Sequence, residues 1–199
     1  MTASYHIPAQ FTPTEIDVKK SRFIAQVKNV NHRQEAMIFL EQAKKTFPDA
    51  RHHCWAYLIG NPHSVSSATM NDGGEPSGTA GKPVLNVIQY KNVGDVMVIV
   101  IRYFDGIKLS VGGLTRAYSS AAEAVLSMVT VKEKIAMTSM VLECDFSQEQ
   151  FVRHWLSQNQ ATVCSVEYGE RVKLGVELAE SSLDEFKKIC EANKFLIVD

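Results

Sequence analysis

A continuous run of apolar residues near the middle of the chain constrains the fold more than any other segment. Every residue of Val96–Ile101 is valine, methionine or isoleucine. A strand with no alternation between polar and apolar side chains must be covered on both faces. The run therefore predicts a strand at the centre of a sheet, with other elements packed against each side of it.

Shorter patterns predict the strands that accompany this central one. Phe23, Ala25 and Val27 alternate with polar residues, which is typical of a strand with one buried face. The further strands expected in this part of the chain are Glu15–Lys19, Ser21–Val30, Cys54–Gly60 and Val65–Met70. The opening of the chain, through about Pro13, has no such pattern, and we expect it to be irregular.

Apolar residues spaced three and four positions apart predict helices between the strands. The most regular of these patterns follows Gly112 and Gly113 and extends to Val129. Two further helices are expected, one over His32–Phe47 and a short one from Thr79 or Ala80 to Tyr90. The residues around Val131–Lys134 are mostly charged, and we interpret them as a connector.

The last third of the chain predicts a separate small domain. Its expected strands are Ala136–Cys144, Val163–Tyr168, Arg171–Leu178 and Phe195–Val198, and its expected helices are Ser147–Gln160 and Ser182–Asn193. The order βαββαβ is that of the ferredoxin-like fold. We therefore expect an α+β protein with one domain at residues 1–133 and a second at residues 134–199.

Two glycine-rich segments flank the central strand. Asn71–Pro83 contains four of the eleven glycines and two of the six prolines, so its backbone is expected to form turns. Arg102–Tyr118 follows the apolar run and leads into the regular helix. Because both segments adjoin one buried element, we expect them to form a shared surface.

Neither glycine-rich segment matches a known nucleotide-binding motif. A P-loop requires a serine or threonine after Gly-Lys, but Pro83 follows Gly81 and Lys82. The spacing of Gly106, Gly112 and Gly113 also differs from that of a dinucleotide-binding fingerprint. Any phosphate contact must therefore come from a different arrangement.

The basic residues of the two segments are candidates for such a contact. A helix N-terminus carries free N–H groups and a partial positive charge, and both favour anions. The candidate phosphate-binding residues are Lys82, Arg102, Lys108, Gly112, Gly113 and Arg116. These cations could instead pair with Asp72, Glu75 and Asp105, and the sequence leaves both interpretations open.

The distribution of charge indicates that any contact with phosphate is confined to a small part of the surface. Residues 1–133 hold fourteen Lys and Arg against eleven Asp and Glu, a net charge of +3, and residues 134–199 hold seven against eleven, a net charge of −4. Neither value is the strong basic excess of an independent nucleic-acid-binding domain.

A second class of function uses the acidic residues of the first segment. Asp72 and Glu75, with His53, could serve as acid and base in a hydrolase or peptidase-like enzyme. Adjacent His52 and His53 on a strand point to opposite faces, so at most one of them can reach such a site. We expect no metal, because no set of side chains has the spacing of a metal site. Under the leading, non-enzymatic interpretation we also expect no catalytic residues and no cofactor.

Cysteine usage and hydropathy indicate a cytoplasmic protein. The four cysteines form no Cys-x-x-Cys pair, which fits reduced thiols; they are Cys54, Cys144, Cys164 and Cys190. There is no apolar run of membrane-spanning length and no signal segment at the start. We therefore expect no contact with a membrane.

Four motifs together resemble those of the YigZ/IMPACT family. They are Ser21–Ala25, His53–Tyr57, Asp72–Pro83 and Arg102–Tyr118, and they cover most of residues 21–122. The chain departs from the family pattern at Asp105 and Ser110, where glycine is expected, and at Gly73, where aspartate is common. An acid at position 105 lowers the positive charge near Lys108.

The resemblance implies both a fold and a function. It implies an N-terminal domain similar to domain 2 of ribosomal protein S5, followed by a ferredoxin-like domain, a tandem similar to domains IV and V of elongation factor G. It further implies a non-enzymatic regulator of translation that binds the ribosome, RNA or a protein partner in translation control.

Overall fold

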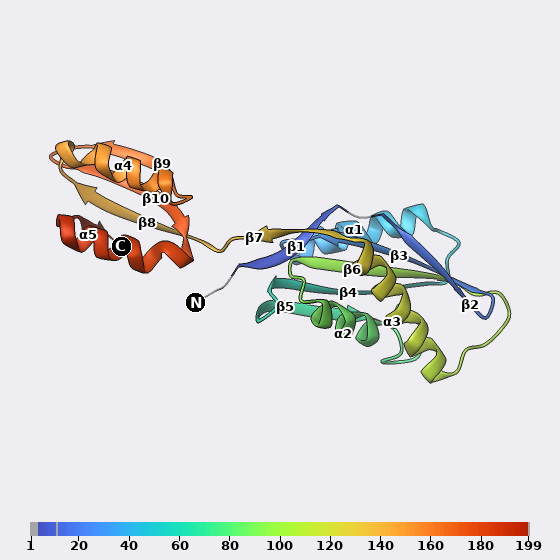
Figure 1. The fold of residues 1–199 in the computed structure, drawn as a ribbon. Helices are drawn as coiled ribbons and strands as arrows, with labels where there is room; N and C mark the ends of the chain where they lie inside the picture. Colours follow the sequence, from blue (N-terminus) through green and yellow to red (C-terminus); the bar gives the residue numbers. More distant parts are fainter. Residues whose placement is uncertain (1–3, 11, 199) are drawn as a thin grey trace. The chain divides into compact units, whose positions relative to one another are not determined.

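The computed structural model describes residues 4–10 and 12–198 (Figure 1). The chain divides into two compact units. The N-terminal unit is Tyr5–Lys134, and the C-terminal unit is built from Ile135 onward.

A five-stranded antiparallel sheet forms the middle layer of the N-terminal unit. Its strands are β2 (Thr14–Val18), β3 (Ser21–Asn29), β4 (His52–Asn61), β5 (Ser64–Asn71) and β6 (Val96–Tyr103). They lie in the order β2-β3-β6-β4-β5, with β6 paired to β3 on one side and to β4 on the other. The central position predicted for the apolar run is confirmed.

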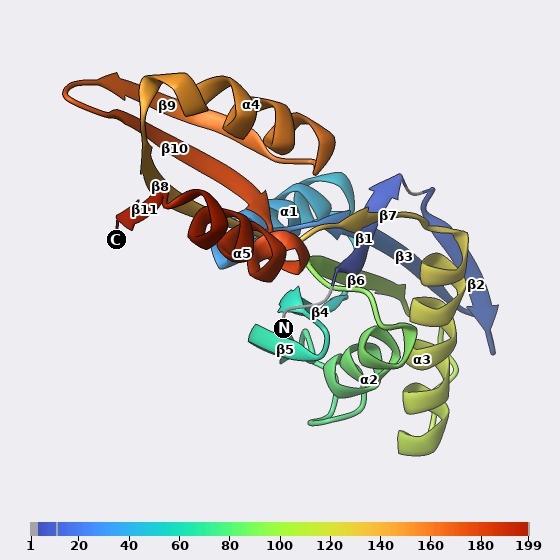
Figure 2. The same cartoon turned by 60° about the vertical axis from the view of Figure 1, so that its left-hand side comes forward.

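Helices cover both faces of this sheet. The helix α1 (Arg33–Thr46) lies on one face, and α2 (Gly81–Lys91) and α3 (Val111–Met128) lie side by side on the other (Figures 1 and 2). Because side chains alternate along a strand, β6 supplies residues to both cores.

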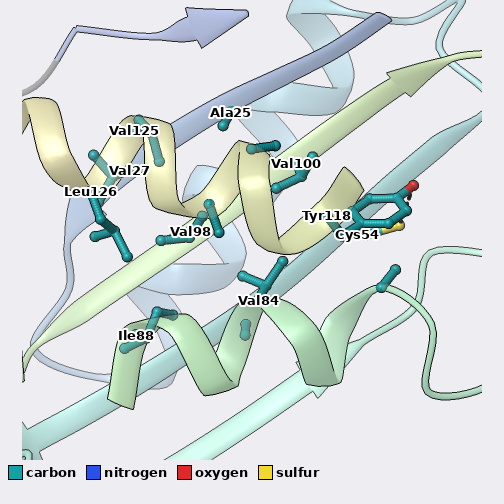
Figure 3. Packing of buried hydrophobic residues seen from close by; sticks show 14 of the residues in the cluster. Ala25, Val27, Cys54, Val84, Ile88, Val98, Val100, Tyr118, Val125 and Leu126 are labelled. Atoms are coloured by element: carbon teal, nitrogen blue, oxygen red, sulfur yellow. Dashed lines mark hydrogen bonds between the residues drawn. The ribbon is translucent and has the colours of Figure 1, made fainter. Parts of the chain in front are cut away.

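The two cores receive alternate residues of the apolar run. Met97 and Ile99 pack in the cluster that contains Phe39 of α1. Val98 and Val100 pack between the sheet and the two other helices, as Figure 3 shows. The absence of any polar side chain in the run is therefore explained by burial on both sides.

A two-stranded ribbon corrects two of the sequence expectations. The opening of the chain forms β1 (Tyr5–Gln10), and the expected connector forms β7 (Thr130–Lys134). The two strands pair antiparallel, with Tyr5 opposite Lys134. The expectations of an irregular opening and a connector were wrong because the partners lie at opposite ends of the unit, and neither segment has a strand pattern of its own.

Asp95 ties this ribbon to the sheet. Its carboxylate accepts hydrogen bonds from the Tyr5 hydroxyl at 2.8 Å, the Lys134 ammonium at 2.5 Å and the Gly60 N–H at 2.8 Å. Its carbonyl oxygen accepts from the Val30 N–H at 2.8 Å. Asp95 is only 2% exposed, so each of these donors would lose a buried partner without it.

The C-terminal unit has the predicted ferredoxin-like topology. Its elements are β8 (Met137–Cys144), α4 (Glu149–Gln158), β9 (Thr162–Tyr168), β10 (Val172–Ala179), α5 (Leu183–Asn193) and β11 (Leu196–Val198). Short 3₁₀ turns, Phe146–Gln148 and Glu180–Ser182, precede the two helices. The strands form an antiparallel sheet in the order β11-β8-β10-β9, and the predicted α+β class is confirmed.

One face of this second sheet carries the core of the unit. Leu142, Leu174 and Val176 are buried against Val152 of α4 and Phe186 of α5. Among the described residues, none of the helices combines the length and apolar character needed to cross a membrane.

Replacing Asp95 is expected to destabilise the N-terminal unit strongly. Asp95→Ala leaves a lysine, a tyrosine hydroxyl and a backbone N–H without their acceptor, and we expect a loss of about 3 kcal/mol in the free energy of unfolding. Urea unfolding followed by Trp55 fluorescence, in a Trp155→Phe background, measures this loss within the N-terminal unit.

The matched control is Asp49→Ala, which removes an exposed carboxylate just after α1. We expect it to change the free energy of unfolding by less than about 0.5 kcal/mol. Equal effects of the two substitutions would contradict the role given to Asp95.

Candidate functional site

Three connections meet at one end of the five-stranded sheet. They are the turn Lys19–Lys20 between β2 and β3, the loop of residues 72–80 between β5 and α2, and the segment of residues 104–110 between β6 and α3. The strand register places them together, because Arg102 lies opposite both Phe23 and His52, and Asn71 lies opposite Trp55. Figure 2 shows the loop before α2 and the first turn of α3 at this same end.

Glu75 connects the two glycine-rich segments. Its Oε1 accepts a hydrogen bond from Arg102 Nη1 at 2.6 Å and another from the Tyr118 hydroxyl at 2.9 Å. The Arg102 and Glu75 side chains are 5% and 4% exposed, so the ion pair is buried. Both segments are therefore held by one carboxylate.

Arg102 does not belong to the exposed surface that the sequence suggested. Besides its pairing with Glu75, its Nη2 donates to Ser21 Oγ at 3.1 Å. Its guanidinium also lies near the rings of Phe23 and Phe104, at 5.5 and 5.3 Å. For this one cation, pairing with an acid is the interpretation that the geometry favours.

Cys54 extends the buried network. Its Sγ donates to the Asp72 carbonyl oxygen at 2.9 Å and lies 3.2 Å from the Tyr118 hydroxyl, beside which Figure 3 shows it. Burial raises the pKa of Cys54 to about 12, and burial also raises the pKa of Tyr118. Both groups are neutral at pH 7, so Cys54 is a structural thiol rather than a nucleophile.

Asp72 acts as the cap of the first loop and of α2. One oxygen of its carboxylate accepts from the N–H groups of Ala80 and Gly81, at 3.0 and 2.9 Å, and the other accepts from the Gly78 N–H at 2.8 Å. Burial acts to raise the pKa of Asp72, but these hydrogen bonds outweigh it and lower the pKa below its usual value. The carboxylate stabilises the loop and the helix N-terminus.

The fold of the first loop requires glycine close to this cap. Gly73 has φ of 57°, in the left-handed region that favours glycine. A Cβ at this position would also lie 2.4 Å from the carbonyl oxygen of His53. The loop is therefore held tightly against the start of β4.

The three residues of the enzyme alternative are not brought together. His52 lies on the side of Glu75, with its Nε2 at 3.9 Å from Glu75 Oε1, and its Nδ1 is 3.0 Å from the Gly73 carbonyl oxygen. His53 points to the other side of β4, where burial and the charge of Lys44 lower its pKa. Within residues 4–10 and 12–198, no three His, Cys, Asp or Glu side chains are grouped as metal ligands.

Three of the predicted cations are exposed at this end of the sheet. Lys82 lies in the first turn of α2, Lys108 in the segment before α3, and Arg116 in the second turn of α3. Among the described residues none of them forms an ion pair, and the exposed Asp105 forms none either. They remain available to an external anion.

The first turn of α3 contains the two predicted glycines. Ser110 caps the helix, and its Oγ accepts from the Gly113 N–H at 3.2 Å. Gly112 is exposed in the same turn and has no side chain to cover the backbone. A Cβ at Gly112 would lie 3.6 Å from Nη1 of Arg116, so the Arg116 guanidinium reaches back to the first turn of the helix.

Lys19 is a candidate that our reading of the sequence missed. A hollow of about 240 Å³ lies beside α3 and is lined by Lys19, Ser110, Gly113 and Arg116, among others. Lys19 and Lys20 occupy a two-residue hairpin turn with φ of 48° and 63°, where asparagine and glycine are preferred. The expected strands Glu15–Lys19 and Ser21–Val30 left only Lys20 between them, so the two-residue turn was not predicted. The pair of adjacent lysines at the junction of the two strands was the signal that could have identified it.

Comparison with known proteins shows a likeness over nearly the whole chain. The Impact N-terminal domain matches residues 19–126, and a domain of unknown function, DUF1949, matches residues 142–188. The IMPACT family member YigZ of Escherichia coli is 34% identical over 92% of this chain and 90% of its own length. YvyE of Bacillus subtilis is 35% identical over 94% of this chain and 86% of its own length.

A further relative and a solved structure agree with these matches. An IMPACT family member of Haemophilus influenzae is 33% identical over 92% of this chain and 89% of its own length. A crystal structure of a hypothetical protein superposes with a TM-score of 0.75, at 32% identity, over 100% of this chain and 98% of its own.

The role of Asp72 predicts a stability difference that depends on pH. Because its pKa is lowered in the folded state, ionised Asp72 stabilises the fold above the unfolded pKa of about 3.9, and this contribution is lost as the pH falls through the folded pKa. We expect Asp72→Asn to lower the free energy of unfolding by about 1 to 2 kcal/mol at pH 7.

Urea unfolding of both proteins at about pH 7 and about pH 3, followed by Trp55 fluorescence as above, tests this expectation. The difference in the free energy of unfolding between wild type and Asp72→Asn should be smaller at the lower pH. Asp49→Asn, at an exposed site, should have the wild-type free energy of unfolding at both pH values. A gap of the same size at both pH values would show that Asp72 acts without its charge.

Proposed function

The chain belongs to the IMPACT family, and from this premise we propose that it is a non-enzymatic regulator of translation that contacts RNA phosphates on the ribosome. The contact surface consists of Lys82, Lys108 and Arg116, with Lys19 at its edge. These residues lie at the end of the N-terminal unit where the two glycine-rich segments meet.

The observation that carries this proposal is the separation of acids and cations at that end of the sheet. Glu75 neutralises the buried Arg102. Asp72 is engaged by three backbone N–H groups. The exposed cations are left without acidic partners among the described residues, and free surface cations attract the phosphate backbone of nucleic acids.

The first turn of α3 supports the same interpretation. Its N–H groups carry a partial positive charge that favours an anion, although Ser110 Oγ already accepts from one of them, the Gly113 N–H. Arg116 lies one turn further along, beside the hollow that Lys19 also lines. Lys19, Ser110 and Arg116 in this lining are suited to a phosphate group, and the rest of the lining includes the apolar Val18, Leu109 and Ala117. A hollow of about 240 Å³ is also smaller than the 300–1,000 Å³ of a typical small-molecule site.

The positions of the acidic residues favour the non-enzymatic proposal over a hydrolase. An acid–base pair needs carboxylates that can reach a substrate, but Glu75 is buried in an ion pair and Asp72 caps a helix. His53 faces away from both. A regulator of translation acts in the cytoplasm, and we place the protein there.

Binding to ribosomes should depend on salt and on two of the exposed cations. We expect cosedimentation with ribosomes that weakens as salt rises. The double variant Lys108→Ala, Arg116→Ala should bind about tenfold more weakly or worse, and its plot of log affinity against log salt should be shallower by about 2.

The matched control is the double variant Arg33→Ala, Lys45→Ala. It removes the same two charges from α1, on the opposite face of the sheet, where both residues are exposed. It should bind as wild type does. Absence of binding at low salt, or equal losses in both double variants, would defeat the proposal, and binding independent of salt would indicate a protein contact instead.

A further inference from the structure

Strand β5 forms an edge of the five-stranded sheet. It pairs with β4 on one side, and the described chain places no strand on its other side. An edge strand presents unpaired N–H and C=O groups to any other extended chain. All eight residues of β5, Ser64–Asn71, are uncharged, and none is proline.

The other edge strands carry features that oppose pairing. At the opposite edge of the same sheet, β2 has Glu15 and Asp17 within five residues. In the C-terminal unit, β9 has Glu167, and β11 is only three residues long. Charges, short length and bulges are among the means by which proteins block an edge. β5 has neither charge nor short length, and its bulge lies outside Ser67–Asn71.

The regular part of β5 is long enough to accept a partner strand. A bulge interrupts the pairing with β4 near Gly60 and Val65, but Ser67–Asn71 continues in unbroken register. This segment also presents apolar surface, because Met70 is 43% exposed.

We propose that β5 pairs antiparallel with β5 of a second copy of this chain, across a two-fold axis at Thr69. This register is centred on the regular segment. It places Thr69 opposite its own copy and Ala68 opposite Met70, and it joins the two sheets into one. The proposal is independent of the RNA contact, which uses other elements.

The composition of β5 favours a second copy over other occupants. A two-fold axis brings the residues closest to it near their own copies, so a charge close to the axis would face an identical charge. A strand without charge avoids this repulsion. An RNA strand would find no cation on β5, and a charged extended peptide would find no complementary charge.

Charge substitutions at Thr69 give a direct test by analytical ultracentrifugation. Wild type should associate to a dimer at micromolar concentrations and dissociate on dilution. Thr69→Lys and Thr69→Glu should each weaken dimerisation by about tenfold or more, because like charges then face each other. An equimolar mixture of the two variants should regain a dimer that contains one copy of each.

The control is Thr162→Lys on β9, the same substitution on an edge strand of the other sheet, and it should leave dimerisation unchanged. Circular dichroism should show that all variants are folded. Wild type that stays monomeric at all concentrations, a Thr69→Lys protein that dimerises normally, or a mixture that does not recover the dimer would each overturn the proposal. The double variant Lys108→Ala, Arg116→Ala should still dimerise, which separates this result from the RNA test.

Discussion

The buried ion pair between Glu75 and Arg102 is the contact on which the arrangement of the candidate site depends. Removing two charges from water is costly, and the cost is offset only when further hydrogen bonds complete the pair. Here Tyr118 and Ser21 supply those bonds. Such a network adds less to stability than apolar packing of the same volume would, but it accepts only one arrangement of the segments that contribute to it.

The same network decides which charges reach the surface. Two acids that are candidates for catalysis on sequence grounds are used internally, Glu75 to hold an arginine and Asp72 to cap a helix. Of the cations predicted at the site, Lys82, Lys108 and Arg116 form no ion pair among the described residues. Although residues 1–133 have a net charge of only +3, the end of the sheet where the loops meet is locally basic.

Patterns contained within one segment were sufficient to predict most of the fold. The apolar run of β6 and the helical spacing of α3 each depend on burial of their own side chains, so a short window reveals them. The ribbon of β1 and β7 is different, because each strand is stabilised by a partner more than a hundred residues away and by the side chain of Asp95. No local window contains that information.

The candidate site could be predicted only in its location. Glycine content marked the two segments, but the sequence could not tell which cation would be neutralised, since that depends on where each carboxylate lies in space. Arg102 and Lys108 are close in the chain, yet one is buried against Glu75 and the other is exposed. The pairing of Tyr5 with Lys134 has a consequence of another kind. The N-terminal unit begins and ends at neighbouring points of one ribbon, so it has the geometry of a cassette that can be excised, circularly permuted or inserted into a loop of another protein without disturbing its own core.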